Sequence, residues 1–231
     1  MKLENRISLV TGGSRGIGKA TALRFASEGS KIILNYKSND EEAEATCNEI
    51  KKFKVECLKA KYDVSKSTDA NTLVKKSLEH FGRVDILFNN AGLMITNTFS
   101  VDDFDQMIKT NVSSVAGIVT ALEGTTYYSI TKGAVITLTR RYAFELGKYG
   151  VNVNGIAPGY IETDLTRKGK SDEEWNKIIE SISKKTILGR IGKPDDIARV
   201  ALFLASNDSD FITGQVIVAD GGRIDYITHS L

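Results

Sequence analysis

A tyrosine and a lysine four residues apart, Tyr128 and Lys132, are the pair in this sequence best suited to proton transfer. Side chains at positions i and i+4 of a helix lie on one face, so both can face the same pocket. Tyrosine loses its proton near pH ~10, and lowering that pKa by about three units requires roughly 4 kcal/mol. One ammonium group about 4 Å away supplies about that much at an effective dielectric of ~20. The pair predicts an acid/base for a carbonyl or an alcohol, although the spacing also fits an ordinary amphipathic helix.

A glycine-rich turn near the N-terminus is the second chemical signal. It reads Thr11-Gly12-Gly13-Ser14-Arg15-Gly16-Ile17-Gly18, follows an apolar run at 7–10 and precedes a helical pattern at 19–28. Glycines let the backbone approach a pyrophosphate, and a helix N-terminus presents N–H groups and the positive end of its dipole. Strand, turn and helix in this order predict a dinucleotide site, the alternative being a tight turn before a packed helix.

The end of the next expected strand predicts which dinucleotide binds. An acidic residue there would accept a hydrogen bond from the ribose 2′-hydroxyl of NAD. This sequence has Asn35, Tyr36, Lys37 and Ser38 instead, with Arg15 in the glycine turn. Two cations without a carboxylate favour the 2′-phosphate of NADP, although Lys37 also fits an ordinary surface lysine.

Further motifs follow in order along the chain. They are Asp63-Val64, Asn89-Asn90-Ala91-Gly92, Asn111, Ser113-Ser114, Tyr128-x-x-x-Lys132, Pro158-Gly159 and Asp220-Gly221-Gly222. With the glycine turn, this set resembles the short-chain dehydrogenase/reductase family from residue 6 to about 222. Within that family the sequence is most similar to 3-oxoacyl-[acyl-carrier-protein] reductases and to related glucose dehydrogenases.

The resemblance implies the catalytic roles. Tyr128 would be the general acid/base, and Lys132 would hold the ribose and lower the tyrosine pKa. Ser114 would hydrogen-bond the substrate oxygen, and Asn111 would hold a water molecule in a proton relay. No metal is part of this scheme.

The resemblance also implies cofactor contacts. Asp63 and Val64 would bracket the adenine, Asn89 and Gly92 would line the cofactor cleft, and Thr163 would hold the nicotinamide carboxamide. The complete expected set is Gly12, Ser14, Arg15, Gly16, Ile17, Gly18, Asn35, Tyr36, Lys37, Ser38, Asp63, Val64, Asn89, Ala91, Gly92, Tyr128, Lys132, Pro158, Gly159, Ile161 and Thr163.

Asn111 and Ser114 stand only three residues apart, which departs from the family pattern. The family places the Asn within a long helix and the Ser at the end of the following strand, and that arrangement needs about 20–25 further residues. The sequence therefore predicts the loss of one central strand and part of the preceding helix. Either the chain truly lacks this segment, or the molecule is longer at Val112–Ser113. Losing about five buried apolar side chains would cost on the order of 10 kcal/mol, which favours the longer molecule.

Length and composition narrow the class of protein. A chain of 231 residues fits one α/β domain, and 31 basic against 29 acidic residues argue against nucleic-acid binding. The sequence shows no run long enough for a membrane span and no signal peptide, which predicts a cytoplasmic protein. Cys47 and Cys57 form no CxxC motif and are expected to be free thiols. His80 and His229 are too few for a metal site or a histidine-based triad.

Alternating strand and helix patterns predict a single Rossmann-like domain over residues 1–231, with a doubly wound parallel sheet and helices on both faces. Strands are expected near 6–11, 31–35, 56–61, 85–89, 151–157 and 215–219. Helices are expected near 17–28, 40–52, 67–81, 101–111, 128–147, 172–184 and 195–205. The stretch from about 164 to 190 is expected to be a mobile substrate loop, the alternative being a solvated helical hairpin.

These patterns predict an NADP-dependent oxidoreductase. Hydride would pass to a ketone carbon while Tyr128 protonates the oxygen, with a 3-oxoacyl thioester on an acyl carrier protein as the first substrate. Oxidation of glucose or another polyol by the same residues is the alternative. A non-catalytic nucleotide-binding scaffold is the third reading if the central deletion is real. Because family members commonly form tetramers, a homo-oligomer, tetramer or dimer, is expected.

Overall fold

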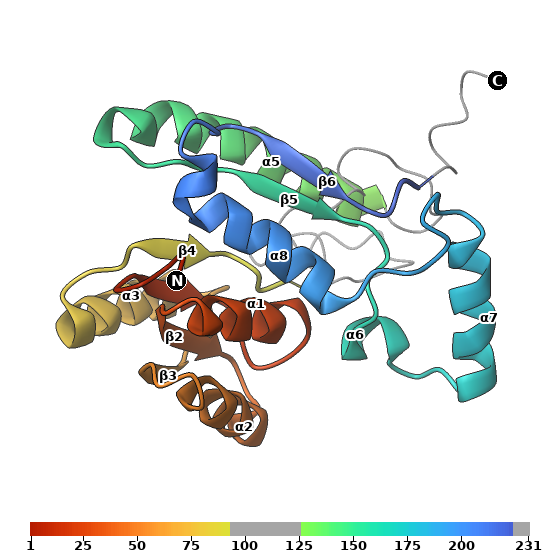
Figure 1. Ribbon diagram of the computed structural model, residues 1–231, viewed down its shortest axis with the longest axis horizontal. Coiled ribbons are helices and arrows are strands. Elements are labelled where there is room, and N and C mark those ends of the chain that lie inside the picture. The colour runs from red at the N-terminus through yellow and green to blue at the C-terminus, as the bar shows by residue number, and fades with distance from the viewer. Residues whose placement is uncertain (93–125, 224–231) are drawn as a thin grey trace. The chain divides into compact units, whose positions relative to one another are not determined.

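The computed structural model describes residues 1–92 and 126–223 (Figure 1). These residues fall into two compact units. The N-terminal unit contains residues 1–92 together with 198–210, and the C-terminal unit contains residues 126–197 together with 211–223. The prediction of a single domain over residues 1–231 stays a prediction.

A parallel sheet of four strands, in the order β3-β2-β1-β4, forms the centre of the N-terminal unit. The strands are β1 (Ile7–Val10), β2 (Lys31–Tyr36), β3 (Cys57–Lys61) and β4 (Ile86–Phe88). Every residue of β1 is buried, as is β2 after Lys31. Strands that are covered by helices on both faces need such near-continuous apolar runs.

Helices cover both faces of this sheet (Figure 1). They are α1 (Gly16–Ser27), α2 (Asp40–Lys51) and α3 (Ser67–Phe81). On the α3 face, Leu73 forms a core cluster with Ile7, Leu9, Ile33 and Ala60. The helices α1 and α2 contact each other and β2 on the opposite face. Odd-numbered residues of β1 therefore face α3, as the two-residue period of a strand requires.

A parallel strand pair forms the centre of the C-terminal unit. The elements of this unit are β5 (Gly155–Pro158), β6 (Val216–Ala219), α5 (Thr126–Leu146), α6 (Asp164–Arg167) and α7 (Asp172–Ser183). The first turn of α8 (Pro194–Ala205) belongs to this unit and the rest of that helix to the N-terminal unit. Short 3-10 turns lie at Gly147–Tyr149 and Asn207–Ser209. The helix α5 packs against the strand pair, because a Cβ built on Gly155 would lie 3.5 Å from Thr139 Oγ1.

The predicted Rossmann-like architecture is confirmed, and the described strands and helices lie close to their predicted ranges. One strand differs, since β5 begins at Gly155 instead of residue 151. The side chain of Asn154 donates to Ile212 O and accepts from Gln215 N, so side-chain hydrogen bonds contribute to the pairing just before the strand. The helix expected near 101–111 and the predicted deletion between Asn111 and Ser114 lie outside the described residues.

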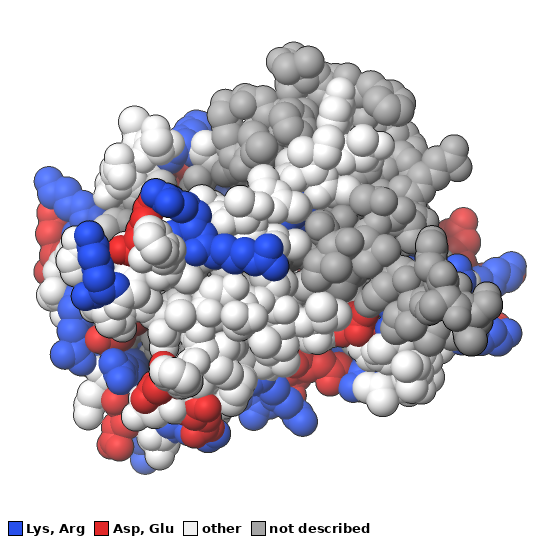
Figure 2. Space-filling view, turned by 90° about the horizontal axis from the view of Figure 1, so that it is seen from above, with Lys and Arg blue, Asp and Glu red and all other residues white. Residues whose placement is uncertain are grey.

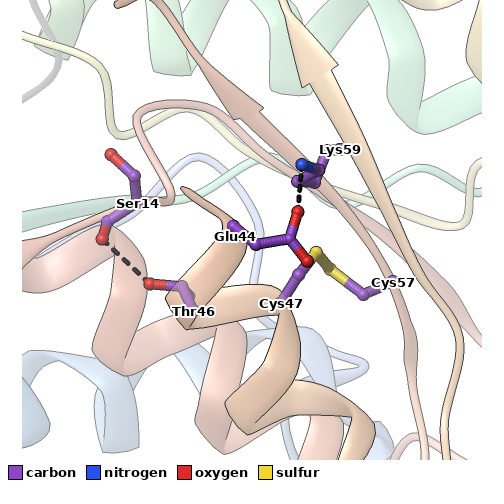
Figure 3. Close-up of a disulfide and its surroundings, with 6 residues drawn as sticks. All are labelled: Ser14, Glu44, Thr46, Cys47, Cys57 and Lys59. Atoms are coloured by element: carbon purple, nitrogen blue, oxygen red, sulfur yellow. Dashed lines mark hydrogen bonds and ion pairs between the residues drawn. A yellow bond between two sulfur atoms is a disulfide. The ribbon is translucent and has the colours of Figure 1, made fainter. Parts of the chain in front are cut away.

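The expectation of free thiols is wrong, because a disulfide joins Cys47 of α2 to Cys57 of β3 (Figure 3). The two Cα atoms lie 5.6 Å apart, within the range that a disulfide spans. This proximity results from the way α2 packs on β3. A separation of ten residues in the sequence does not reveal it.

Charged side chains of both signs lie close to one another on the face shown in Figure 2. This mixture agrees with the net charge of +2. Across residues 1–92 and 126–223, no helix combines the length and the apolar character that a membrane span requires.

Candidate active site

The glycine turn is fixed to the segment that follows β4. Thr11 Oγ1 accepts hydrogen bonds from the backbone N–H groups of Asn90 and Ala91 at 2.9 and 3.0 Å. In the other direction, Asn90 Nδ2 donates to the carbonyl oxygens of Thr11 and Gly12 at 3.0 and 3.2 Å. Thr11 and Asn90 therefore hold the shape of the turn. Neither is among the expected cofactor contacts, although both belong to motifs visible in the sequence.

Gly12 and Gly18 are required by the geometry of the turn. Gly12 has a φ of +61°, in the left-handed region that favours glycine. A Cβ at Gly18 would lie 2.2 Å from the carbonyl oxygen of Gly12 and 2.6 Å from Asn90 Nδ2. Only glycine allows α1 to start this close to the turn.

The N-terminus of α1 is suited to an anion. Its N-cap residue, Arg15, makes no side-chain capping hydrogen bond, and its first turn contains no acidic residue. By contrast, Asn39 caps α2 and Ser171 caps α7, and each of those helices has three acidic residues in its first turn. The backbone N–H groups at the start of a helix have no acceptor within it. These residues fit the pyrophosphate of a dinucleotide.

Two of the expected 2′-phosphate contacts direct their side chains inward. Asn35 is buried, and its Nδ2 donates to the carbonyl oxygens of Ala60 and Tyr62 at 3.1 and 3.0 Å. The hydroxyl of Tyr36 donates to Asp40 at 2.8 Å. Burial, and then the Asp40 carboxylate, raise the pKa of Tyr36 to about 12. Their backbone carbonyl oxygens accept hydrogen bonds from Gly13 N and Tyr62 N at 2.8 and 3.0 Å, so both residues stabilise the unit.

Lys37, Ser38 and Arg15 are exposed, as a site for a phosphate group requires. Lys37 Nζ lies 2.9 Å from Asp63 Oδ2. The hydrogen bonds from Ser65, and then Lys37, lower the pKa of Asp63 to about 2, so its carboxylate is ionised at neutral pH. The exposed cation thus lies beside the residue expected to contact the adenine.

The other expected contacts of this unit occupy three places. Gly16 and Ile17 form the first turn of α1, and Ser14 precedes them with its carbonyl oxygen accepting from Thr46 at 3.0 Å. Val64 packs against the core cluster on the α3 face. Asn89 and Gly92 are exposed and Ala91 is half-buried after β4.

Tyr128 and Lys132 lie on one face of α5, as their spacing predicts. Lys132 Nζ is 4.9 Å from the centre of the Tyr128 ring. Only 4% of Lys132 is exposed, and this burial lowers the pKa of its amine to about 7. The hydroxyl of Thr131 donates to the carbonyl oxygen of Tyr128 at 2.7 Å. When this buried amine is protonated, it places a cation next to the tyrosine, the arrangement that an activated phenol needs.

The buried amine predicts a pH-dependent stability of the cofactor-free chain. An unfolded lysine titrates at about 10.5 and folded Lys132 at about 7, so between these pH values the unfolded chain binds more protons. The free energy of unfolding therefore rises with pH between these two values. The part of it that comes from the lowered pKa of Lys132 is lost as the pH falls toward 7. We expect the free energy of unfolding to rise by about 2 kcal/mol more in the wild type than in Lys132→Met between pH ~7 and pH ~9. The free energy of unfolding is measured by urea denaturation at each pH. The same change with pH in both proteins would contradict the assignment.

The end of β5 leads into the segment expected to contact the nicotinamide. The backbone N–H of Gly159 donates to Ala219 O at 3.1 Å, and a Cβ at Gly159 would lie 2.7 Å from the Cα of Asp220. The Pro158-Gly159 turn therefore passes too close to the Asp220-Gly221-Gly222 motif for a larger residue. The sequence showed both motifs, and the structure shows that they pack together.

Thr163 and Ile161 have local structural partners. Thr163 is the N-cap of α6, and its Oγ1 accepts from Thr166 N at 3.3 Å. Ile161 is buried and forms a parallel bridge with Gly192. Thr163, the expected contact of the nicotinamide carboxamide, therefore lies with its hydroxyl at the start of a helix.

The expected substrate loop of about 164–190 contains α6 and α7. Trp175 of α7 is buried, with its ring 6.3 Å from that of Tyr160. Burial raises the pKa of Tyr160. Tyr160 is not among the predicted site residues, although it directly follows Pro158-Gly159 in the sequence. The predicted mobility of the loop stays a prediction.

Asn111 and Ser114, the other two expected catalytic residues, lie outside the described residues. Within residues 1–92 and 126–223, no group of three or more His, Cys, Asp or Glu side chains is arranged to hold a metal ion.

Comparison with known families decides the classification. The family model described as short chain dehydrogenase matches residues 6–122, and the one described as Enoyl-(Acyl carrier protein) reductase matches residues 112–223. The chain belongs to the short-chain dehydrogenase/reductase family. It is therefore an oxidoreductase that uses a nicotinamide cofactor, and the resemblance seen in the sequence is confirmed.

Individual relatives cover nearly the whole chain. The L-rhamnose 1-dehydrogenase (NADP(+)) of Thermoplasma acidophilum is 34% identical, over 97% of this chain and 98% of the relative. A 3-oxoacyl-[acyl-carrier-protein] reductase of Staphylococcus epidermidis is 36% identical, over 94% of this chain and 98% of the relative. The solved structure of a short chain dehydrogenase from Burkholderia cenocepacia in complex with NADP has a TM-score of 0.88 and 26% identity, and the match covers 96% of this chain and 99% of that one.

The alignments also indicate residues that this chain lacks. The alignment with the L-rhamnose dehydrogenase has 252 positions but covers 97% of 231 residues, so about 28 positions have no residue in this chain. The matches of the two family models overlap at residues 112–122, a stretch that follows Asn111 directly and contains Ser114. This shortfall agrees with the segment of about 20–25 residues that ordinary element lengths require.

The intact mass of the purified chain tests the two explanations of this shortfall. A mass near the 25.3 kDa of this sequence would show a real deletion. We expect a mass about 2–3 kDa higher, the weight of one helix-and-strand unit, because a sheet without its central strand loses too much buried surface. Electrospray mass spectrometry of the native gene product distinguishes the two results.

Proposed function

We propose that this enzyme transfers hydride between NADP(H) and a carbonyl or secondary alcohol, and that its substrate is a 3-oxoacyl thioester on an acyl carrier protein. The observation that carries the chemistry is the Tyr128–Lys132 pair on α5, with its amine buried beside the tyrosine ring. The 36% identical reductase from Staphylococcus epidermidis supports the substrate class. The proposal places the enzyme in the cytoplasm, as a homo-oligomer.

Proton transfer is the part of the reaction that this chain performs itself. When bound, the nicotinamide supplies or accepts the hydride. The Tyr128 hydroxyl donates a proton to the carbonyl oxygen as the alcohol forms, and in the other direction its phenolate removes that proton. Lys132 stabilises the phenolate, since a cation favours the charged form of a neighbouring acid. Ser114 and Asn111 are proposed to orient the substrate oxygen and to hold the water that returns the proton.

The NADP preference is proposed from the cations at the end of β2 and in the glycine turn. Lys37 and Arg15 are exposed there, and no carboxylate occupies positions 35–38. A 2′-phosphate brought to this place meets two cations, whereas the 2′-hydroxyl of NAD finds no acceptor of the usual kind. The NADP-dependent relative from Thermoplasma acidophilum agrees with this assignment.

Removing Lys37 is expected to weaken NADPH binding selectively. Lys37→Ala should raise the Kd for NADPH about 10-fold and change the Kd for NADH less than 2-fold, because one charge-assisted contact to phosphate is lost, worth about 1.5 kcal/mol. Titration of cofactor fluorescence measures both constants. Lys51→Ala, which removes an exposed lysine at the opposite end of α2, is the matched control and should leave both unchanged. An equal loss for NADPH and NADH would reject the role of Lys37.

A sugar is the second substrate candidate, because the NADP-dependent L-rhamnose dehydrogenase matches 97% of this chain. The two candidates are separated by comparing turnover of a 3-oxoacyl thioester with NADPH against turnover of glucose or L-rhamnose with NADP⁺. Faster turnover of the thioester supports the proposal, and faster turnover of a sugar replaces it. A purified chain that binds NADPH but turns over neither would favour the non-catalytic scaffold.

A further inference from the structure

Helix α2 lies along β3 with a regular seam of side-chain contacts. In order along the helix, the contacts begin with Asp40 and Lys61. Glu44 with Lys59 and Cys47 with Cys57 follow (Figure 3). Positions i, i+4 and i+7 share one face of a helix, and alternate residues share one face of a strand. The sequence therefore directs one stripe of α2 onto one face of β3, with the helix running opposite to the strand.

The disulfide is the strongest member of this seam. The four charged side chains of the two ion pairs are 35–56% exposed. Exposed ion pairs contribute little to stability, because water screens them and long side chains lose entropy. Cys47, by contrast, is 1% exposed and covalently bonded to Cys57. Opening the disulfide therefore leaves the two exposed ion pairs and the apolar packing of Ala43 and Ile50 to hold α2 in place.

A second stripe of α2 contacts the glycine turn and α1. The hydroxyl of buried Thr46 donates to the carbonyl oxygen of Ser14 at 3.0 Å (Figure 3). One turn further along, Glu49 pairs with Lys19 at 2.8 Å. Thr46 is adjacent in the chain to Cys47. A displacement of α2 on β3 is thus passed directly to the backbone of the turn.

We propose that Cys47 and Cys57 form a thiol–disulfide switch that sets the affinity of the glycine turn for its dinucleotide, with Thr46 as the positioning residue. The disulfide form holds α2 in the position that keeps Ser14 in place, and the dithiol form releases it. The inference rests on the proposed function only for the identity of the ligand. Cytosolic disulfides in mesophiles are rare and usually redox-sensing or catalytic, which agrees with a switch in the proposed compartment.

The redox step is a thiol–disulfide exchange with a dithiol reductant. Cys57 is half-buried and Cys47 fully buried, so the thiolate of the reductant attacks the sulfur of Cys57 and Cys47 leaves as a thiolate that takes a proton. The second thiol of the reductant then displaces Cys57. The protein gains two thiols, and the reductant becomes a cyclic disulfide. A small-molecule disulfide reverses the step.

The affinity for NADPH and for NADH in the two redox states tests the switch. We expect reduction of the wild-type protein with dithiothreitol to raise the Kd for the preferred cofactor about fivefold, at the low end of the usual coupling between two sites. Cys47→Ala/Cys57→Ala should show the weak affinity under both conditions. Thr46→Val should weaken cofactor binding in the disulfide form and make the Kd independent of redox state. Thr46→Ser keeps the hydroxyl and should restore the wild-type affinity and its dependence on redox state.

A stability control separates positioning from general weakening. Leu73→Val reduces packing on the α3 face of the sheet and lowers the melting temperature while leaving α2 and its contacts in place. Its cofactor Kd should stay at the wild-type value and keep the response to dithiothreitol. A Kd that is equal in the two redox states of the wild type, with NADPH turnover intact, would overturn the switch and leave the proposed function standing. Redox-dependent binding of NADH without binding of NADPH would support the switch and overturn the proposed cofactor.

Discussion

Replacing Tyr128 by phenylalanine is expected to lower kcat for carbonyl reduction by a factor of about 10²–10⁴, the usual contribution of one positioned acid/base. The change removes the hydroxyl and keeps the ring that lies 4.9 Å from Lys132 Nζ. Packing on α5 and the position of the buried amine should therefore be preserved. We expect the Kd for NADPH to change by less than about tenfold, the effect of one lost hydrogen bond. Steady-state kinetics and a cofactor titration measure the two effects.

Tyr127 offers a matched control for this substitution. It is the preceding residue of the same helix, and the residue four positions further on is Thr131, whose hydroxyl donates to a backbone carbonyl. Tyr127→Phe should keep kcat within a few-fold of the wild type. A large loss of kcat in Tyr127→Phe together with a small loss in Tyr128→Phe would assign the acid/base role to Tyr127 instead of Tyr128.

Replacing Gly18 by alanine is expected to disrupt the nucleotide turn. The new methyl group would lie 2.2 Å from the carbonyl oxygen of Gly12, so the backbone of the turn or the start of α1 must move. Overpacking of this kind costs about 1–3 kcal/mol, which corresponds to a fall in Tm of roughly 2–12 °C in a chain of this size. The N–H groups at the start of α1 then no longer converge on the pyrophosphate, and the Kd for NADPH should rise at least about tenfold.

Gly147 provides the comparison for Gly18→Ala. A Cβ at Gly147 meets no atom within 4 Å among the described residues, and Gly147 is not among the glycines of positive φ. Gly147→Ala should keep the wild-type Tm within about 2 °C, as for a surface substitution away from special features. It should also keep the wild-type NADPH affinity. Isothermal titration and differential scanning calorimetry on both variants measure these effects, and unchanged NADPH binding in Gly18→Ala would show that the turn does not bind the cofactor.

Local sequence patterns predicted most of the fold, since hydrophobic periodicity and turn residues determine its elements. The apolar runs of β1 and β2 and the helical spacing of α3 were visible because each pattern depends on neighbours in the chain. The same holds for Tyr128 and Lys132, whose shared face follows from their separation by four residues. Family resemblance added the role of each residue, and the comparisons confirmed the family.

Features that depend on packing could not be predicted. Asn35 and Tyr36 have the types and the position of cofactor contacts, but their side chains point to β3 and α2 because the end of β2 is covered there. The disulfide between Cys47 and Cys57 requires α2 to lie over β3, which no spacing encodes. The reciprocal hydrogen bonds of Thr11 and Asn90 join residues 79 positions apart. Such contacts become visible only once the sheet has formed.

Transfer of deuterium from NADPH labelled at the reactive position of the nicotinamide tests the central claim most directly. The purified enzyme is incubated with the labelled cofactor and a 3-oxoacyl thioester, and the product is examined by mass spectrometry and NMR. A single deuterium on the new alcohol carbon, formed by the wild type and not by Tyr128→Phe, is the result we predict. Binding of the labelled cofactor with no deuterium transferred to this thioester or to any activated ketone would contradict the assignment of the chain as a carbonyl reductase.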